Sequence, residues 1–149
     1  MIKLIRTNLS NPDFHKLIVK LDHEFVVRYP FLKDTFTPFN LMNENASVIM
    51  AYDHTIPVAS GAFRPVDEQT IEIKRMYTLP SYRNQGIGKR ILIALEQWAR
   101  AEGFLVSKLE TGINQPEAIA AYEKSGYKRI PNFPPYVEVQ ESICMEKYL

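Results

Sequence analysis

The sequence has 149 residues, with 18 lysines and arginines against 17 aspartates and glutamates and a formal net charge of +1. This length predicts one domain over residues 1–149, because domains cluster at about 100–150 residues. The near-neutral charge argues against a nucleic-acid partner, which needs a basic surface, and against electrostatic recruitment to a membrane.

The cysteines, histidines and apolar runs of the sequence show which disulfides, metal sites and membrane segments the chain can form. Cys144 is the single cysteine, which excludes an intramolecular disulfide and zinc sites built from paired thiolates. The histidines His15, His23 and His54 follow no ligand motif, so no metal is expected. The longest apolar run, residues 91–95, is far shorter than the roughly 20 residues of a membrane-spanning helix. Because the N-terminus also lacks a signal-peptide pattern, we expect a cytoplasmic protein without a membrane partner.

The N-terminal segment predicts a strand followed by a helix. Residues 2–6 alternate apolar and basic side chains, which is typical of a short strand. Ser10 is the expected helix N-cap, because an acid follows three residues later and a proline lies in the first turn. The helix is expected to end before Pro30, since the residue before a proline resists helical geometry. Residues 31–46 predict a loop with one short helix.

The remaining chain predicts further strands and helices in turn. Gly103 and Gly126 follow helical patterns and are expected to end them. Strands are predicted over residues 47–52, 56–64, 70–78, 108–111, 127–130 and 142–147, with helices over 86–102 and from 114 to 126. This mixture predicts an α/β or α+β fold with helices packed on the faces of a sheet.

The most informative segment is the loop from Arg83 to Gly88, which lies between a strand and a helix. Unpaired N–H groups and the positive end of the helix dipole meet there, and glycine lets an anion approach the main chain. A helix start without a ligand is the alternative. Two other nucleotide loops do not fit: the GxGxxG pattern fails at Ile91, and the P-loop pattern fails at Arg90, which follows Lys89.

Three segments in order resemble the core of the GCN5-related N-acetyltransferase (GNAT) superfamily. They are the strand over residues 72–78, the loop over 83–88 with its helix, and residues 118–127, which carry a tyrosine and end in glycine and an aromatic residue. The resemblance covers residues 70–127 well, and the N-terminal part matches in element order only. It implies a mostly antiparallel mixed sheet of about six to seven strands with helices on both faces.

The resemblance also implies the reaction and its cofactor site. The expected reaction is transfer of the acetyl group of acetyl-CoA to a primary amine of a small molecule or peptide, by direct attack in a ternary complex. The family pattern places the pyrophosphate at the glycine loop and the pantetheine arm on the preceding strand. Gln115 is included although the family usually has asparagine there. The candidate cofactor-binding residues are Met76, Tyr77, Thr78, Arg83, Asn84, Gln85, Gly86, Ile87, Gly88, Lys89 and Gln115.

Two residues match the catalytic positions of the family. Glu72 lies where several members carry a catalytic glutamate, and an amine that is protonated at neutral pH needs such a base. Its alternative is a solvent-facing strand glutamate, opposite the core-facing Ile71 and Ile73. Tyr122 matches the tyrosine that protonates the leaving thiolate, and its alternative is a half-buried helix tyrosine. The N–H of Tyr77 or Thr78 is the expected oxyanion donor.

The acceptor is expected near residues 25–39 and 131–136. One interpretation is an aromatic wall formed by Tyr29, Phe31, Phe133 and Tyr136, and the alternative for each of these residues is ordinary loop packing. Acids such as Glu24 and Asp34 would favour a polyamine, whereas the bases Arg64, Lys74 and Arg75 would favour an acceptor with a carboxylate, and strand register decides between them. The alternative functions are a non-catalytic acetyl-CoA sensor and an adaptor unrelated to CoA. The sequence leaves a homodimer open.

Overall fold

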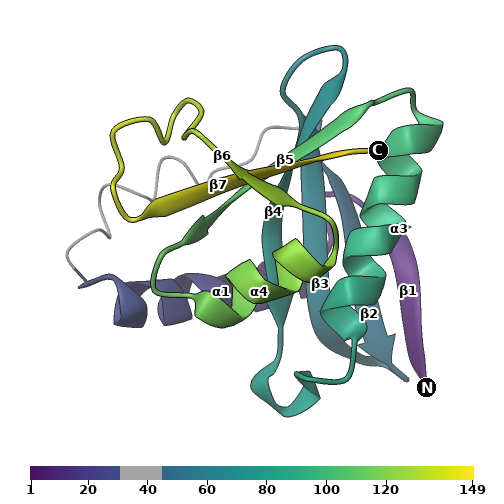
Figure 1. The fold of residues 1–149 in the computed structure, drawn as a ribbon. Coiled ribbons are helices and arrows are strands. Elements are labelled where there is room, and N and C mark those ends of the chain that lie inside the picture. The colour runs from purple at the N-terminus through teal and green to yellow at the C-terminus, as the bar shows by residue number, and fades with distance from the viewer. Residues whose placement is uncertain (31–44) are drawn as a thin grey trace.

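A seven-stranded sheet, ordered β1-β2-β3-β4-β5-β7-β6, organises this computed structural model, which describes residues 1–30 and 45–149 (Figure 1). The strands are β1 (Ile2–Thr7), β2 (Ser47–Asp53), β3 (Ile56–Pro65), β4 (Thr70–Thr78), β5 (Val106–Gly112), β6 (Lys128–Ile130) and β7 (Ser142–Tyr148). The helices are α1 (Pro12–Arg28), α3 (Ile87–Ala101) and α4 (Pro116–Lys124), with a 3-10 turn η2 (Pro80–Tyr82). The predicted strands and helices are therefore confirmed in order and type. The predicted loop over residues 31–46 falls almost wholly outside the described residues.

The N-cap of α1 differs from the prediction. The Asn11 side chain, not that of Ser10, accepts hydrogen bonds from the N–H groups of Asp13 at 2.8 Å and Phe14 at 3.2 Å. Asn11 directly precedes Pro12, the first helical residue, so its short amide reaches the free N–H groups of the first turn. The N–H of Ser10 instead donates to the side chain of Asn8, two residues earlier.

Two apolar clusters lie on opposite faces of the sheet, because successive strand side chains alternate. On one face, Ile49 of β2 packs with Ile91 and Leu95 of α3. On the other, Val48 of β2 packs with Phe14 of α1. Figure 1 shows α1 on the face of the sheet opposite α3, so the expectation of helices on both faces is confirmed.

The sheet is antiparallel except between β4 and β5, which α3 connects. Their parallel ladder ends at Ile73 and Leu109, although β4 continues to Thr78 and β5 to Gly112. The two strands diverge from this point. Main-chain groups along the diverging edges lack ladder partners, so they need hydrogen bonds from elsewhere.

A β-bulge bends β4 beside this opening. The ladder with β3 shifts between Lys74 and Tyr77, so Arg75 and Met76 together lie opposite Gly61. Arg75 has a φ of 59°, a left-handed conformation that non-glycine residues seldom adopt. Bulges of this kind turn side chains toward sites at the edges of strands.

We expect Gly61→Ala to lower the free energy of unfolding by about 1–3 kcal/mol, the usual cost of overpacking. A Cβ at Gly61 would contact Met76 Sδ and would lie 2.7 Å from Ile91 Cγ2. Denaturant unfolding measures the loss. Gly88→Ala is the control, because its Cβ would lie 3.7 Å from the nearest side chain, Thr78. Equal stability of the two variants would mean that α3 can shift away from β3 without cost.

Candidate functional site

A cavity of about 480 Å³ lies beside the end of β4, bounded by α1, by the start of α3 and by α4. Its walls contain most of the residues that the sequence predicted for the cofactor: Met76, Tyr77, Thr78, Arg83, Asn84, Gly86, Ile87, Gly88, Lys89 and Gln115. Gln85 is exposed and lies outside the lining, and its side chain donates to the Ser81 carbonyl at 3.4 Å.

The glycine loop turns the chain from η2 into α3 along one wall of this cavity. Asn84 and Gly86 both have left-handed backbones, with φ of 63° and 79°. Among the described residues, no side chain hydrogen-bonds to the start of α3. Its first N–H groups and the positive end of its dipole therefore form an anion site at the cavity wall.

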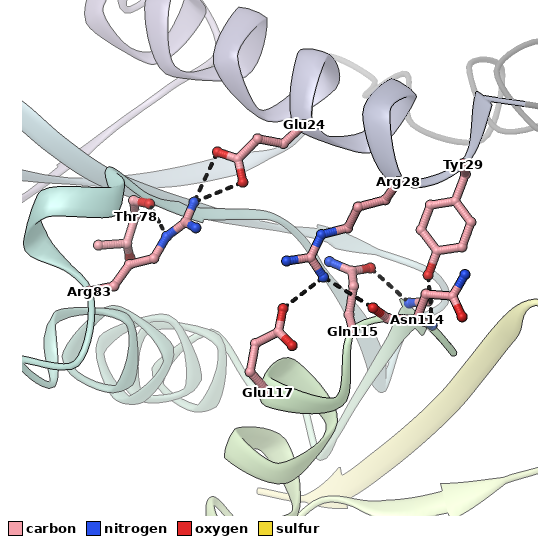
Figure 2. Close-up of polar contacts among 9 residues, drawn as sticks. Glu24, Arg28, Tyr29, Thr78, Arg83, Asn114, Gln115 and Glu117 are labelled. Carbon is pink, nitrogen blue, oxygen red and sulfur yellow. Dashed lines mark hydrogen bonds and ion pairs between the residues drawn. The ribbon is translucent and has the colours of Figure 1, made fainter.

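An ion pair links α1 to this loop (Figure 2). Arg83 Nη2 lies 3.0 Å and 2.9 Å from the two carboxylate oxygens of Glu24, and Arg83 Nε donates to the Thr78 carbonyl at 2.8 Å. Burial opposes ionisation of Glu24, but hydrogen bonds from Tyr77 and Arg83 outweigh it and lower the pKa of this carboxyl. The pair fixes the guanidinium beside the glycine loop.

A second set of contacts links the end of α1 to the start of α4 (Figure 2). Arg28 Nη1 lies 2.7 Å from Glu117 Oε1, and Tyr29 Oη accepts a hydrogen bond from the Asn114 N–H at 2.9 Å. Gln115 Oε1 accepts the N–H of the last β5 residue at 3.1 Å. The contacts of Arg28 and Tyr29 join the end of α1 to the segment that begins α4.

A smaller cavity of about 140 Å³ adjoins the first. The two share Leu21, Phe25, Met76, Gln115, Ala118 and Tyr122 as wall residues. Lys74 and Arg75 of β4 and Glu110 of β5 line the smaller cavity, and Arg64 does not. The structure thus gives the strand register that the sequence left open.

Glu72 is only 1% exposed and lines neither cavity. Arg64 Nη2 donates to its Oε1 at 2.7 Å, and the Tyr136 hydroxyl donates to its Oε2 at 2.8 Å. Lys74 Nζ lies 3.9 Å from the same carboxylate, on the face that alternation predicts. The alternative of a solvent-facing glutamate is therefore wrong, because the loop carrying Tyr136 covers this face. The role of Glu72 as base stays a prediction.

Glu110 is the titratable group that sequence reasoning missed. It lines the smaller cavity, and Ser142 Oγ donates to its Oε2 at 2.6 Å. Burial raises the pKa of Glu110 to about 7, the charge of Glu72 adds to this, and Ser142 and Lys74 act in the opposite direction. The sequence placed Glu110 in a strand but gave no sign that the strand leaves its neighbour at this residue.

Tyr122 lies in the wall between the two cavities. Its ring contacts that of Tyr127 edge to face, with centroids 5.9 Å apart. Burial, together with the charge of Glu110, raises the pKa of the Tyr122 hydroxyl to about 12. The hydroxyl therefore keeps its proton at neutral pH, as a proton donor must.

The three members of the aromatic wall that the structure describes, Tyr29, Phe133 and Tyr136, line neither cavity. Tyr136 is buried against Glu72, with Phe133 packed edge to face on its ring at 5.4 Å, and Tyr29 is held by Asn114. Phe31 and Asp34 lie outside the described residues. The hydroxyls of Tyr29 and Tyr136 hydrogen-bond to neighbouring elements, which agrees with the alternative of ordinary loop packing for these two rings.

Two further expectations concern metals and membranes. Within residues 1–30 and 45–149, no group of three or more His, Cys, Asp or Glu side chains is arranged to hold a metal ion. None of the helices described has the length and apolar character needed to cross a bilayer.

The family profile, a curated relative and a solved structure that match this chain are all described as acetyltransferases or acyltransferases. The profile of the acetyltransferase (GNAT) family matches residues 11–127. An "IAA acetyltransferase" of Azospirillum brasilense is 42% identical over 78 residues, which are 52% of this chain and 51% of that protein. The chain spans 51% to 63% of the length of the first curated relatives it matches.

Solved structures match over the whole chain. A Klebsiella pneumoniae protein described as a candidate acyl-CoA N-acyltransferase has a TM-score of 0.84 at 31% identity, covering 100% of this chain and 98% of that one. The PaiA N-acetyltransferase of Thermoplasma acidophilum, solved in complex with coenzyme A, has a TM-score of 0.75 at 17% identity, covering 100% and 99%. At this identity the second likeness concerns the fold alone.

Proposed function

The chain belongs to the acetyltransferase (GNAT) family, and on this premise we propose that it transfers the acetyl group of acetyl-CoA to a primary amine of a small molecule or peptide. The proposal treats residues 1–149 as one catalytic domain. One observation carries it: the cavity beside the end of β4 has the glycine loop on one wall and Tyr122 on another. The predicted cytoplasmic location stays a prediction, and a homodimer is left open.

The residues present fit acetyl-CoA. The start of α3 offers N–H groups to a pyrophosphate, and Gly88 leaves the main chain accessible because it has no side chain. The diverging edge of β4 from Met76 to Thr78 offers main-chain groups to the amides of a pantetheine arm. When bound, acetyl-CoA supplies the activated thioester on which the reaction depends.

Three tasks fall to the chain's own residues. An amine must lose a proton before it attacks, and Glu72, directly or through a water molecule, is the base that the sequence predicts. Tyr122 is proposed to protonate the departing thiolate. An N–H of Tyr77 or Thr78 is proposed to stabilise the negative charge that develops on the carbonyl oxygen.

The test combines binding and turnover. Calorimetry with acetyl-CoA measures cofactor binding, and thiol release across a panel of amines, amino acids and peptides measures transfer. Binding together with thiol release for at least one primary amine is the expected result. Binding without turnover across the panel would favour the sensor alternative, and absence of binding would reject both.

A further inference from the structure

We propose that Glu24 of α1 competes with the diphosphate of the cofactor for the guanidinium of Arg83, and that this competition lowers the affinity of the site for acetyl-CoA and CoA. The inference rests on the proposed binding of acetyl-CoA. It moves Glu24 from the acceptor side, where the sequence analysis placed it, to the control of cofactor affinity.

Glu24 lies on the cofactor side of the site. It comes from α1 and faces Arg83, 59 residues further along the chain, and the two side chains meet across the larger cavity (Figure 2). Glu24 is not among the wall residues of the smaller cavity. Its carboxylate therefore places a negative charge beside the glycine loop and Lys89, where the site otherwise favours an anion.

The hydrogen bonds of Arg83 show what an arriving diphosphate meets. Nη2 donates to both carboxylate oxygens of Glu24, at 3.0 Å and 2.9 Å, and Nε donates to the Thr78 carbonyl at 2.8 Å. A guanidinium recognises phosphate oxygens with the same N–H groups that it uses for a carboxylate. Glu24 therefore occupies hydrogen bonds of Arg83 that a diphosphate would accept, and it neutralises the charge.

The pair is charged and still able to exchange partners. Burial opposes ionisation of Glu24, but hydrogen bonds from Tyr77 and Arg83 lower its pKa, so it is a carboxylate at neutral pH. The side chains of Arg83 and Glu24 are 38% and 34% exposed. Because water screens an ion pair of this exposure, opening it costs little. A competing anion at the glycine loop can then take Arg83 from Glu24.

Binding has two costs as a result. Arg83 gives up its contacts with Glu24, and the Glu24 carboxylate then faces a second anion across the cavity without its partner. Acetyl-CoA and the product CoA carry the same diphosphate, so the competition weakens both to the same extent. Glu24 thereby favours release of the product as much as it opposes binding of the substrate.

The main test is Glu24→Gln, which keeps the length of the side chain and removes its charge. We expect this variant to bind acetyl-CoA about threefold to tenfold more tightly than wild type in calorimetry at low ionic strength. Free CoA should gain the same factor and become a correspondingly stronger product inhibitor. Unchanged or weaker binding would overturn the inference, because Glu24 would then have no influence on Arg83 or would hold it ready for the diphosphate.

Two further readouts distinguish competition for an anion from a general change in the cavity. S-acetylpantetheine ends before the diphosphate, so its affinity should be the same for wild type and Glu24→Gln. An equal gain for both ligands would mean that the substitution merely opens the cavity, and would overturn the inference. The gain for acetyl-CoA should also shrink at high ionic strength, since salt screens exposed charges.

A double-mutant cycle tests whether Glu24 acts through Arg83. In an Arg83→Gln background Glu24 has no guanidinium to hold, so Glu24→Gln should tighten acetyl-CoA binding by less than half the factor it gives in wild type. The same factor in both backgrounds would overturn the competition for Arg83.

Two other ion pairs of α1 provide controls. Asp22→Asn removes a carboxylate that lies 2.6 Å from Arg75 Nη1 and outside the lining of the larger cavity, so acetyl-CoA affinity should stay at the wild-type value. Glu117→Gln removes the partner of Arg28 and leaves Arg83 with Glu24. Its gain should be smaller than that of Glu24→Gln, and an equal gain would mean that loosening α1 governs affinity. Thermal melting confirms that each variant is folded.

The outcomes separate this inference from the proposed function. If the wild type binds acetyl-CoA and acetylates an amine of the panel while Glu24→Gln binds the cofactor no more tightly, the inference is overturned and the proposed function stands. If the wild type binds no acetyl-CoA, the proposed function fails and the inference fails with it.

Discussion

Tyr122→Phe is expected to slow turnover by about 10²–10⁴, the range that general acid–base catalysis supplies, while acetyl-CoA affinity stays at the wild-type value. The substitution keeps the ring that contacts Tyr127 and deletes only the hydroxyl. Because the hydroxyl has a pKa raised to about 12, it remains protonated throughout the neutral range in the wild type. Its loss therefore removes a proton donor throughout the neutral range.

Single-turnover and steady-state thiol release measure this effect, with calorimetry for the cofactor. Tyr127→Phe is the matched control, because it also removes a buried hydroxyl from the neighbouring ring. That hydroxyl hydrogen-bonds to Ser107 at 2.7 Å and to Glu96 at 2.9 Å, and it lines neither cavity. The control should lose stability and keep its turnover. Wild-type turnover in Tyr122→Phe would make Tyr122 a wall residue without a chemical role.

Local sequence patterns were sufficient to predict the order and type of the strands and helices. Pro30 and the Gly126 turn end helices through their own backbone constraints, and the alternation around Ile71 and Ile73 determines which face of β4 meets the core. These effects act within a few residues, so they are visible in one sequence. The glycine loop is of the same kind, since its left-handed turn and the following helix start are neighbours in the chain.

The chemistry of the acceptor side depends on contacts that are distant in sequence. Glu72 is covered by Tyr136, 64 residues away, and Glu110 bonds to Ser142, 32 residues away. Whether a strand residue lines a cavity also depends on where its ladder ends, here after Leu109. Alternation assigns a face but gives no sign of where two strands diverge, which is why Glu110 was missed.

The last prediction concerns the anion site. We expect Gly88→Val to weaken acetyl-CoA binding by more than tenfold, about 1.4 kcal/mol or above. Gly88 lies in the first turn of α3 without a left-handed backbone, and the nearest atom to a Cβ there is Thr78 Oγ1 at 3.7 Å. The free protein can therefore hold a side chain at this position. The valine methyl groups would occupy the space through which a phosphate approaches the main-chain N–H groups.

Gly86→Val should also weaken acetyl-CoA binding. It would obstruct the phosphate and also strain the backbone of the loop, because Gly86 has a φ of 79° that valine tolerates poorly. Gly88→Val is the sharper experiment for this reason, with Gly88→Ala expected between it and wild type. Ala101→Val places the same side chain at the exposed far end of α3 and controls for a change in the helix itself. Calorimetry at one salt concentration compares the four proteins with wild type. A folded Gly88→Val variant that binds acetyl-CoA as tightly as Ala101→Val would remove the start of α3 from the cofactor site, since a phosphate at those N–H groups and a valine at residue 88 compete for the same space.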